Sequence, residues 1–274
     1  MKIFFSILTA SIICFHSYAQ IINKDLYIPA DENMILNVKQ FSQFVKRFNY
    51  EEDFSGNKIS PEFTAKFPRN AYMAYLFNIQ DERLNNDSPE DQKYQSKVHE
   101  FVLQVSNKNE HISRYSEKIY VVALCEIQYK SIKKELHLLL QQEKVNDGLK
   151  WVICDVLNME DIVKTEPSSP NVFIPPSSNE LNFTHLRRAF DDKQNFSDYY
   201  SRDFQLNPLH VLEQEVKSGS IEFQHVKKMV YFVFDIEGWV IQIEEFIRDD
   251  MNSGWLISNL EKWNTDPNVY FERK

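Results

Sequence analysis

The clearest pattern along the chain is a glycine that precedes an alternating strand beginning near a tryptophan, and it occurs twice. It reads DGLKWVICDVL at residues 147–157 and SGWLISNLEKW at residues 253–263. Alternation of apolar and polar residues is typical of a strand with one buried face. The polar residues 146–148 and 252–254 tolerate a positive φ, so we predict that each triplet closes an antiparallel hairpin. We expect Trp151 and Trp255, which begin these strands at equivalent positions, to lie in the core.

A stretch with helical spacing precedes each of these strands. Residues 41–55 align without a gap with residues 183–197. In both stretches large apolar residues recur at positions i, i+3 and i+7, which places them on one face of an amphipathic helix. These residues are Phe41, Phe44 and Phe48 in the first stretch and Phe183, Leu186 and Phe190 in the second.

Between helix and tryptophan strand, each half holds segments rich in β-branched and aromatic residues, which favour strands. With the tryptophan strands included, the first half has four such segments, at residues 99–105, 117–129, 134–145 and 149–157. The second half repeats the order at residues 221–226, 227–236, 239–247 and 254–263. We therefore predict an internal duplication, with antiparallel strands following a helix in each copy.

A proline- and serine-rich segment, TEPSSPNVFIPPSSNE at residues 165–180, separates the two copies. Such a composition favours extended geometry and ends regular structure on both sides. The predicted organisation is a first domain at 20–163, a linker at 164–179, a shorter second domain at 180–264 and a tail at 265–274. Each domain is long enough to fold alone, so we expect residues 20–163 to be separable from the rest.

The order of helix, curved antiparallel strands and final glycine–tryptophan hairpin, in two copies, resembles the nuclear-transport-factor-like superfamily of α+β cones. The resemblance implies an α+β fold of two tandem cone-like domains, each with N-terminal helices packed on a curved antiparallel sheet that leaves a cavity. The second copy is shorter than a full family member. The alternative is an unrelated antiparallel α+β sheet in each half.

The first nineteen residues, MKIFFSILTASIICFHSYA, have a lysine, an apolar run and small residues at cleavage spacing. This arrangement predicts a secretory signal peptide cleaved after Ala19. The run is too short to span a bilayer, and no later segment of the sequence is long and apolar enough to do so. We expect a periplasmic or secreted protein without a membrane span.

Charge narrows the choice of partner. Residues 1–19 contain one lysine and no acid, so their removal changes the net charge from −9 to −10. This excess disfavours nucleic acid and anionic membrane surfaces and favours a basic protein. The sequence has no glycine-rich phosphate loop, no nucleophile elbow and no zinc-binding helix motif. We therefore predict neither a cofactor nor a metal site.

Enzymes of the resembled superfamily place an acid, a histidine or a tyrosine inside the cone to move protons. The resemblance makes His225, Tyr231 and Glu244 the catalytic candidates. His225 alternates with Phe223, which suggests that it faces inward. A histidine or tyrosine on a strand is more often structural, so we expect a protein without catalytic activity.

Large aromatic residues and carboxylates supply the binding candidates. Aromatic residues bring contact area with a polar handle, and carboxylates suit a basic partner. The candidates are Tyr199, Tyr200, Phe204, Trp239, Glu244, Glu245, Asp249 and Asp250. We predict recognition of another extracytoplasmic protein, as an immunity or assembly partner. The alternatives are capture of a small apolar ligand in the first cone and an isomerase- or dehydratase-type activity.

Two cysteines, Cys125 and Cys154, follow the signal peptide. Each shares a strand face with apolar residues, so both look buried. Burial alone does not bring two sulfur atoms within bonding reach. We predict two free buried thiols, although the compartment would permit a disulfide.

Overall fold

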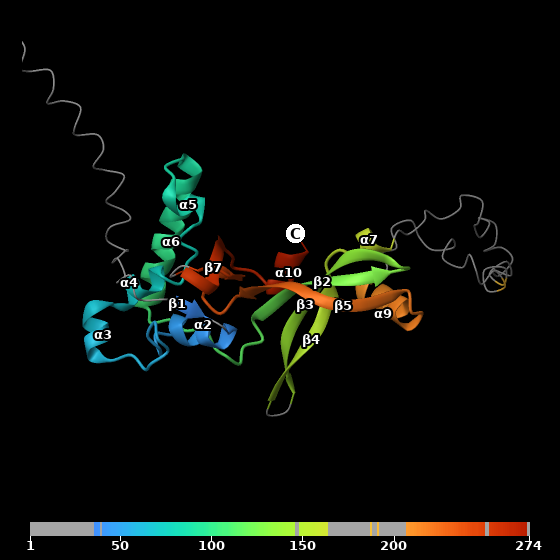
Figure 1. Cartoon of the computed structure of the whole chain (residues 1–274), viewed down its shortest axis with the longest axis horizontal. Coiled ribbons are helices and arrows are strands. Elements are labelled where there is room, and N and C mark those ends of the chain that lie inside the picture. The colour runs from blue at the N-terminus through green and yellow to red at the C-terminus, as the bar shows by residue number, and fades with distance from the viewer. Residues whose placement is uncertain are drawn as a thin grey trace, which may run out of the picture. The chain divides into compact units, whose positions relative to one another are not determined.

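The computed structural model describes residues 36–38, 40–145, 148–163, 187, 191, 207–249 and 252–272 (Figure 1). The fold class is α+β, as predicted. The helices are α2 (Phe41–Phe48), α3 (Pro61–Lys66), α4 (Arg69–Ala74), α5 (Glu82–Asn85), α6 (Pro89–Asn107), α7 (Met159–Ile162), α9 (Pro208–Lys217) and α10 (Pro267–Phe271). The strands are β1 (Leu36–Val38), β2 (Ile119–Tyr129), β3 (Ile132–Val145), β4 (Gly148–Val156), β5 (Ile221–Val233), β6 (Trp239–Phe246) and β7 (Asn252–Lys262).

The strands are ordered β1-β7-β6-β5-β2-β3-β4 in the sheet. Two runs of three consecutive strands, β2-β3-β4 and β5-β6-β7, therefore adjoin through β2 and β5. β6 pairs antiparallel with both β5 and β7, and β1 adds parallel to β7. The two tryptophan strands of the sequence are β4 and β7, the last strand of each run. The repeated pattern thus corresponds to two three-stranded runs.

Three sequence predictions of local structure were wrong. Residues 99–105 lie in α6, because Tyr94, Val98, Phe101, Val102 and Val105 repeat with helical spacing and are all buried. The segments 221–226 and 227–236 belong mainly to one long strand, β5. Residues 252–254 lie in β7 and are buried, although Gly254 has the positive φ, 97°, that its position suggested.

The chain divides into two compact units, and neither follows the predicted division at residues 164–179. Among the described residues, unit 1 comprises those within 36–123, 140–152 and 228–272, and unit 2 comprises those within 124–139 and 153–227. Each unit thus draws on sequence from both predicted domains. Two tandem domains, 20–163 followed by 180–264, are therefore not what the structure shows.

The core of unit 1 explains this difference. The apolar face of α2 and the buried face of α6 pack against β6 and β7, which come from the other end of the chain. Phe44, Phe48 and Phe101 share one buried cluster with Trp239 and Ile257. The Phe101 and Trp239 rings meet at 5.3 Å in an edge-to-face arrangement. A helix buries its apolar stripe against whichever sheet the topology supplies, and here that sheet comes from the second half.

A second aromatic cluster in unit 1 is built around α10. Tyr270 and Phe271 are buried and contact the rings of Phe232 and Phe234 at 5.3–6.2 Å. Asp266 caps this helix by accepting a hydrogen bond from the Asn268 backbone. The predicted tail at 265–274 is therefore, over residues 267–271, a helix packed on the sheet.

The described part of unit 2 has a small core. Its described residues include parts of β2, β3, β4 and β5 together with α7 and α9. Lys134 donates hydrogen bonds to the carbonyls of Asp161 and Ile162 at the end of α7. The buried apolar residues are Cys125, Ile127, Leu136, Leu139, Val156, Met159, Ile162 and Ile221.

The thiols and tryptophans of the sequence predictions have mixed outcomes. Neither Cys125 nor Cys154 is in a disulfide, as predicted, but only Cys125 is fully buried. Cys154 is half-buried, with its Sγ 3.4 Å from the Leu139 carbonyl.

Trp255 is buried as expected, whereas Trp151 is 42% exposed. Trp255 belongs to the cluster that α2 and α6 cover and meets the Tyr231 ring edge-on at 5.0 Å, whereas Trp151 is not part of that cluster.

Candidate functional site

The turn between β6 and β7 carries the most exposed large apolar residue of the described chain. Ile247 is 88% exposed. Glu245 and Asp249, which flank it, are also exposed. We refer to residues 245–249 as the hairpin tip. An isoleucine left in water between two carboxylates forgoes burial worth about 1.5–3 kcal/mol, which contact with a partner would recover.

Hydrogen bonds to the backbone fix the hairpin tip. The Arg248 N–H donates to Ser253 Oγ at 3.0 Å, and that hydroxyl donates to the Phe246 carbonyl at 3.0 Å. The Arg248 guanidinium donates to Asn78 Oδ1 at 2.8 Å and lies 4.7 Å from the centre of the Phe246 ring. These contacts tie the residues on both sides of Ile247 to the body of unit 1.

Asn252 extends this support inward. It is buried, its Nδ2 donates to the Phe77 carbonyl at 2.9 Å, and its Oδ1 accepts from the Ile79 N–H at 3.0 Å. A buried amide with donor and acceptor both satisfied favours a single geometry. The hairpin tip therefore holds Ile247 outward on a fixed support, which suits an anchor for an apolar pocket with a basic rim.

The acidic candidates separate into different environments. Glu245 and Asp249 are exposed on the hairpin tip, where they could face basic groups around a partner's apolar pocket. Glu244 is half-buried, forms an ion pair with Lys228 and accepts from Gln242 Nε2 at 2.7 Å. Burial raises the pKa of Glu244, but hydrogen bonds from Lys228, Ser258 and Gln242 outweigh burial and hold that pKa below its ordinary value. Glu244 is thus an internal partner of Lys228 and is not one of the exposed carboxylates of the hairpin tip.

Of the aromatic candidates, Trp239 is a core residue, only 1% exposed. Its indole Nε1 donates to Gln104 Oε1 at 2.9 Å, and the Lys262 ammonium lies 3.7 Å from the ring centre. Four candidates, Tyr199, Tyr200, Phe204 and Asp250, lie outside the described residues.

The three catalytic candidates do not converge. Tyr231 stacks on Phe41 with the ring centres 3.9 Å apart and meets the Trp255 ring edge-on at 5.0 Å. Burial raises the pKa of Tyr231. In the ladder Tyr231 lies opposite Ile243, and Glu244 lies opposite Val230. Since adjacent residues point to opposite faces of a sheet, Tyr231 and Glu244 face away from each other.

His225, the third candidate, lies in unit 2 and is exposed, as is Phe223. The prediction that these two side chains face inward was therefore wrong. The prediction failed because residues 222–229 of β5 are all exposed. In this part of the strand, alternation in the sequence does not correspond to alternation in burial.

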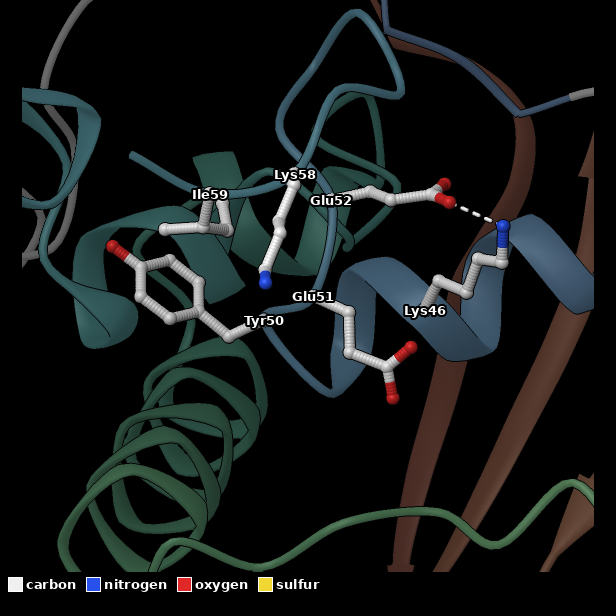
Figure 2. Close-up of a pocket in the computed structure, with 6 residues that line it drawn as sticks. All are labelled: Lys46, Tyr50, Glu51, Glu52, Lys58 and Ile59. Atoms are coloured by element: carbon white, nitrogen blue, oxygen red, sulfur yellow. Dashed lines mark hydrogen bonds and ion pairs between the residues drawn. The ribbon is translucent and has the colours of Figure 1, made fainter. Parts of the chain in front are cut away.

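A pocket of about 550 Å³ opens beside the end of α2 (Figure 2). Lys46 and Glu52 form an ion pair across it, and Lys58 extends toward Tyr50 and Glu51. The Tyr50 hydroxyl donates to the Phe67 carbonyl at 2.5 Å. Ile59 completes a lining that is mostly charged. Sites for small apolar ligands are lined mainly by hydrophobic residues, so this pocket does not support apolar-ligand capture.

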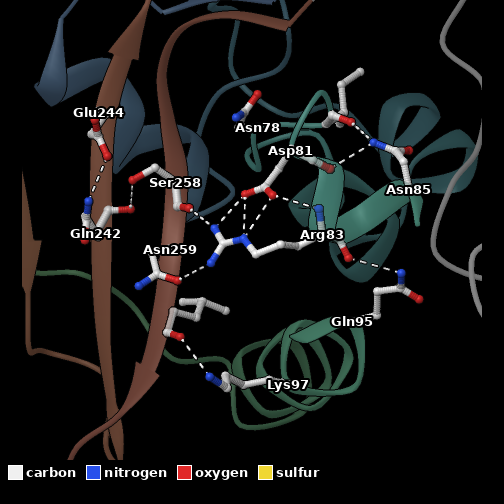
Figure 3. A network of polar contacts seen from close by, with 12 residues as sticks. Asn78, Asp81, Arg83, Asn85, Gln95, Lys97, Gln242, Glu244, Ser258 and Asn259 are labelled. Atoms are coloured by element: carbon white, nitrogen blue, oxygen red, sulfur yellow. Dashed lines mark hydrogen bonds and ion pairs between the residues drawn. The ribbon is translucent and has the colours of Figure 1, made fainter. Parts of the chain in front are cut away.

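A network of polar contacts is centred on Arg83 (Figure 3). Its guanidinium donates to both oxygens of Asp81 at 2.6–3.2 Å, to Asn259 Oδ1 at 3.0 Å and to the Ser258 carbonyl at 2.8 Å. It also lies 4.0 Å from the centre of the Tyr94 ring. Burial raises the pKa of Asp81, and the hydrogen bonds from Arg83 more than offset this and lower it. With its donors directed at β7, the network attaches the α5 turn to the sheet.

Sequence reasoning missed Ile247 and Arg248. The local signal is an isoleucine between two pairs of acidic residues in a stretch, EEFIRDD, that runs from a strand into a turn. An apolar residue at such a position has no core to enter. The role of Arg248 depends on Asn78, 170 positions earlier, and no local pattern reveals that partner.

Comparisons with protein-family models, curated proteins and solved structures gave no match. None of the described helices has the length and apolar character needed to cross a membrane. Among the described residues, no three histidine, cysteine or acidic side chains gather as metal ligands would.

Proposed function

We propose that this chain is a non-catalytic, extracytoplasmic binding protein that recognises a basic protein through the hairpin tip. The exposed Ile247, held between the two exposed carboxylates of Glu245 and Asp249, carries this proposal. Extracytoplasmic location follows from the signal peptide expected at residues 1–19. In this role Ile247 fills an apolar pocket on the partner, and the carboxylates face its basic rim.

Two features of the chain support a basic partner. The net charge of −10 that remains once residues 1–19 are removed speeds the approach of a cationic surface, over a range of about 8 Å at physiological ionic strength. The fixed support of the hairpin tip reduces the entropy lost on binding, because little has to be ordered when the complex forms. The immunity or assembly role expected from the sequence is compatible with such a partner.

The experiment immobilises three forms of this chain, the wild type and two variants, and compares what each retains from the envelope fraction of the source organism. Immobilised wild-type chain retains the partner, Ile247→Ser loses it, and Tyr115→Ser retains it. Tyr115 is the matched control because it is 81% exposed in the same unit and lies far along the chain from the hairpin tip. Loss of a central apolar anchor typically costs at least about 2 kcal/mol, or roughly thirty-fold in affinity. Equal capture by all three proteins would overturn the proposal.

The carboxylates are tested by kinetics. With the captured partner in hand, the double variant Glu245→Gln, Asp249→Asn should associate more slowly than wild type, with little change in residence time. Added salt should reduce the wild-type association rate toward that of the variant. A basic partner whose association is insensitive to both changes would remove the electrostatic part of the proposal.

A further inference from the structure

The pocket beside the end of α2 lies within unit 1 and has an excess of positive charge (Figure 2). Both of its carboxylates already have a cation. Lys46 forms an ion pair with Glu52. The Arg114 guanidinium donates to Glu51 at 2.9 Å. The Lys58 ammonium, by contrast, forms no ion pair with a described carboxylate and no hydrogen bond with a described group, so its charge is left over.

The backbone determines where the Lys58 ammonium can reach. Glu52 and Lys58 pair as an isolated antiparallel bridge. In the turn between them, the Asp53 carboxylate accepts from two backbone N–H groups, each at 2.8 Å. The Lys58 side chain is exposed and extends from this hairpin toward Tyr50. An ordered hairpin thus presents a cation at the pocket.

Tyr50, which also lines the pocket, has an unusual backbone conformation. Its φ is 59°, in the left-handed region that favours glycine. The Tyr50 N–H donates to the Arg47 carbonyl at 2.9 Å. The next N–H, that of Glu51, donates to the Lys46 carbonyl at 2.8 Å. Helices that end with this pair of bonds usually have glycine where α2 has Tyr50. Strained residues of this kind are concentrated at functional positions such as ligand clamps.

The side chain of Tyr50 gives the pocket an apolar surface. Its hydroxyl is already used in the bond to the Phe67 carbonyl. One side of the ring is supported by Tyr72, edge-on at 5.5 Å, and by Phe63 at 6.5 Å. The ring is only partly buried and lines the pocket together with Ile59. The pocket therefore combines a free ammonium with aromatic and aliphatic surface.

We propose that this pocket binds a small organic monocarboxylate with a planar apolar body. The carboxylate accepts a charge-assisted hydrogen bond from the Lys58 ammonium, which is stronger than a bond between neutral groups. The apolar body covers the Tyr50 ring and Ile59. The inference goes beyond the proposed function, since it concerns a different site and a different class of ligand.

Size and charge both limit the ligand. A volume of about 550 Å³ is in the range of small-molecule sites. One free cation suits one carboxylate, whereas a phosphate with two negative charges would also meet the carboxylates of Glu51 and Glu52. The net negative charge of the chain does not prevent binding of an anion. Its distant charges are screened over about 8 Å at physiological ionic strength, whereas the Lys58 ammonium is in direct contact.

The experiment titrates the full chain with three probes at physiological ionic strength and follows binding by nuclear magnetic resonance. Benzoate has both the charge and the planar body. Benzamide has the same ring without the charge, and acetate has the charge without the ring. Benzoate should bind saturably, and each of the other two should bind at least about fivefold more weakly.

Variants of the exposed lysine assign the site without disturbing the core. Lys58→Met should weaken benzoate binding at least about fivefold, and Lys58→Arg should preserve it. Lys93→Met, which removes an exposed lysine of α6, is the matched control and should bind benzoate as wild type does. Tyr50→Gly suits the backbone and removes the ring, so it should bring the affinity for benzoate down toward that for acetate. Ile247→Ser should bind benzoate normally, so failure of this proposal and failure of the proposed function are distinguishable.

Three results would overturn the proposal. The first is the absence of saturable benzoate binding by the wild-type chain. The second is equal affinity for benzoate and benzamide, which would show that the ammonium does not contribute. The third is unchanged benzoate affinity in Lys58→Met with a wild-type circular dichroism spectrum, which would place the bound benzoate elsewhere on the chain.

Discussion

Unit 1 and unit 2 differ in how completely their strands are covered. In unit 1, α2, α4 and α6 bury a large aromatic and aliphatic cluster against β6 and β7, and α10 packs on Phe232 and Phe234. In unit 2, the described part of α9 has no fully buried residue, and residues 222–227 of β5 are exposed on both faces. Long strands of similar composition thus serve as a core in one unit and as surface in the other.

The comparison shows that strand propensity does not decide burial. Tyr231 and Phe223 are both aromatic residues on β5, yet Tyr231 stacks on Phe41 whereas Phe223 is 59% exposed. Tyr231 lies opposite Ile243 of β6 and packs under Phe41 of α2. Among the described residues, Phe223 has neither a β6 partner nor a covering helix residue in ring contact. Strand propensity measures how well a residue suits a pleated surface, whereas the neighbouring strands and helices decide whether that residue is buried.

The largest expected effect concerns the integrity of unit 1. The fragment 20–163 lacks β6 and β7, which the cluster around Phe44 and Phe101 requires. Although its length suggested independent folding, the structure leads us to expect no cooperative thermal transition from this fragment. The full chain should show such a transition under the same conditions, followed by circular dichroism. A cooperative transition of the fragment would show that the first half builds a core of its own.

The next effect is the loss of one aromatic side chain from the same cluster. Phe101→Ala should lower the free energy of unfolding by about 3–5 kcal/mol, because it leaves a cavity beside Phe48 and Trp239. Tyr115→Ala, which truncates an aromatic side chain that is 81% exposed, is the control and should change it by less than about 0.5 kcal/mol. Chemical denaturation of both variants measures the difference. Similar values for the two would contradict the described packing.

Much of the secondary structure could be predicted from the sequence, because it depends on local spacing. The helical stripe of Phe41, Phe44 and Phe48 and the strands β2, β3, β4, β6 and β7 follow periodicities that a short window contains. The resemblance between β4 and β7 also came from local pattern. α6 was only partly recognised, since residues 99–105 are rich in β-branched and aromatic residues, which favour strands.

The division into units and the candidate site depended on distant partners that no local pattern contains. α2 packs against strands that lie about two hundred residues later, so the proline-rich segment did not mark a boundary between cores. For the same reason, Glu244 could not be distinguished from Glu245 in the sequence. Only the ladder shows that Glu244 lies opposite Val230 and reaches Lys228.

A smaller effect is expected from a core substitution in unit 2. Leu136 is buried there, among few other buried apolar residues of the part of unit 2 that the structure describes. Leu136→Ala should cost about 2–3 kcal/mol, at the low end for such changes, because a small core leaves more room to collapse around the cavity. Hydrogen exchange should show faster local opening of unit 2 residues and unchanged protection of α6. Equal loss of protection in both units would show that they unfold as one.

The smallest effect concerns pH and the ion pair of Glu244 with Lys228 in unit 1. The folded pKa of Glu244 lies below its ordinary value of 4.5. A lowered pKa means that the ionised carboxylate stabilises the fold above pH 4.5, and this stabilisation is lost as the pH falls through the folded pKa. Glu244→Gln should therefore lower the melting temperature most at neutral pH and progressively less below pH 4.5. Glu245→Gln, on the same strand but exposed, is the matched control and should change it less at every pH. If Glu244→Gln lowered the melting temperature equally from neutral to acidic pH, its effect would come from packing and not from the charge that Lys228 stabilises.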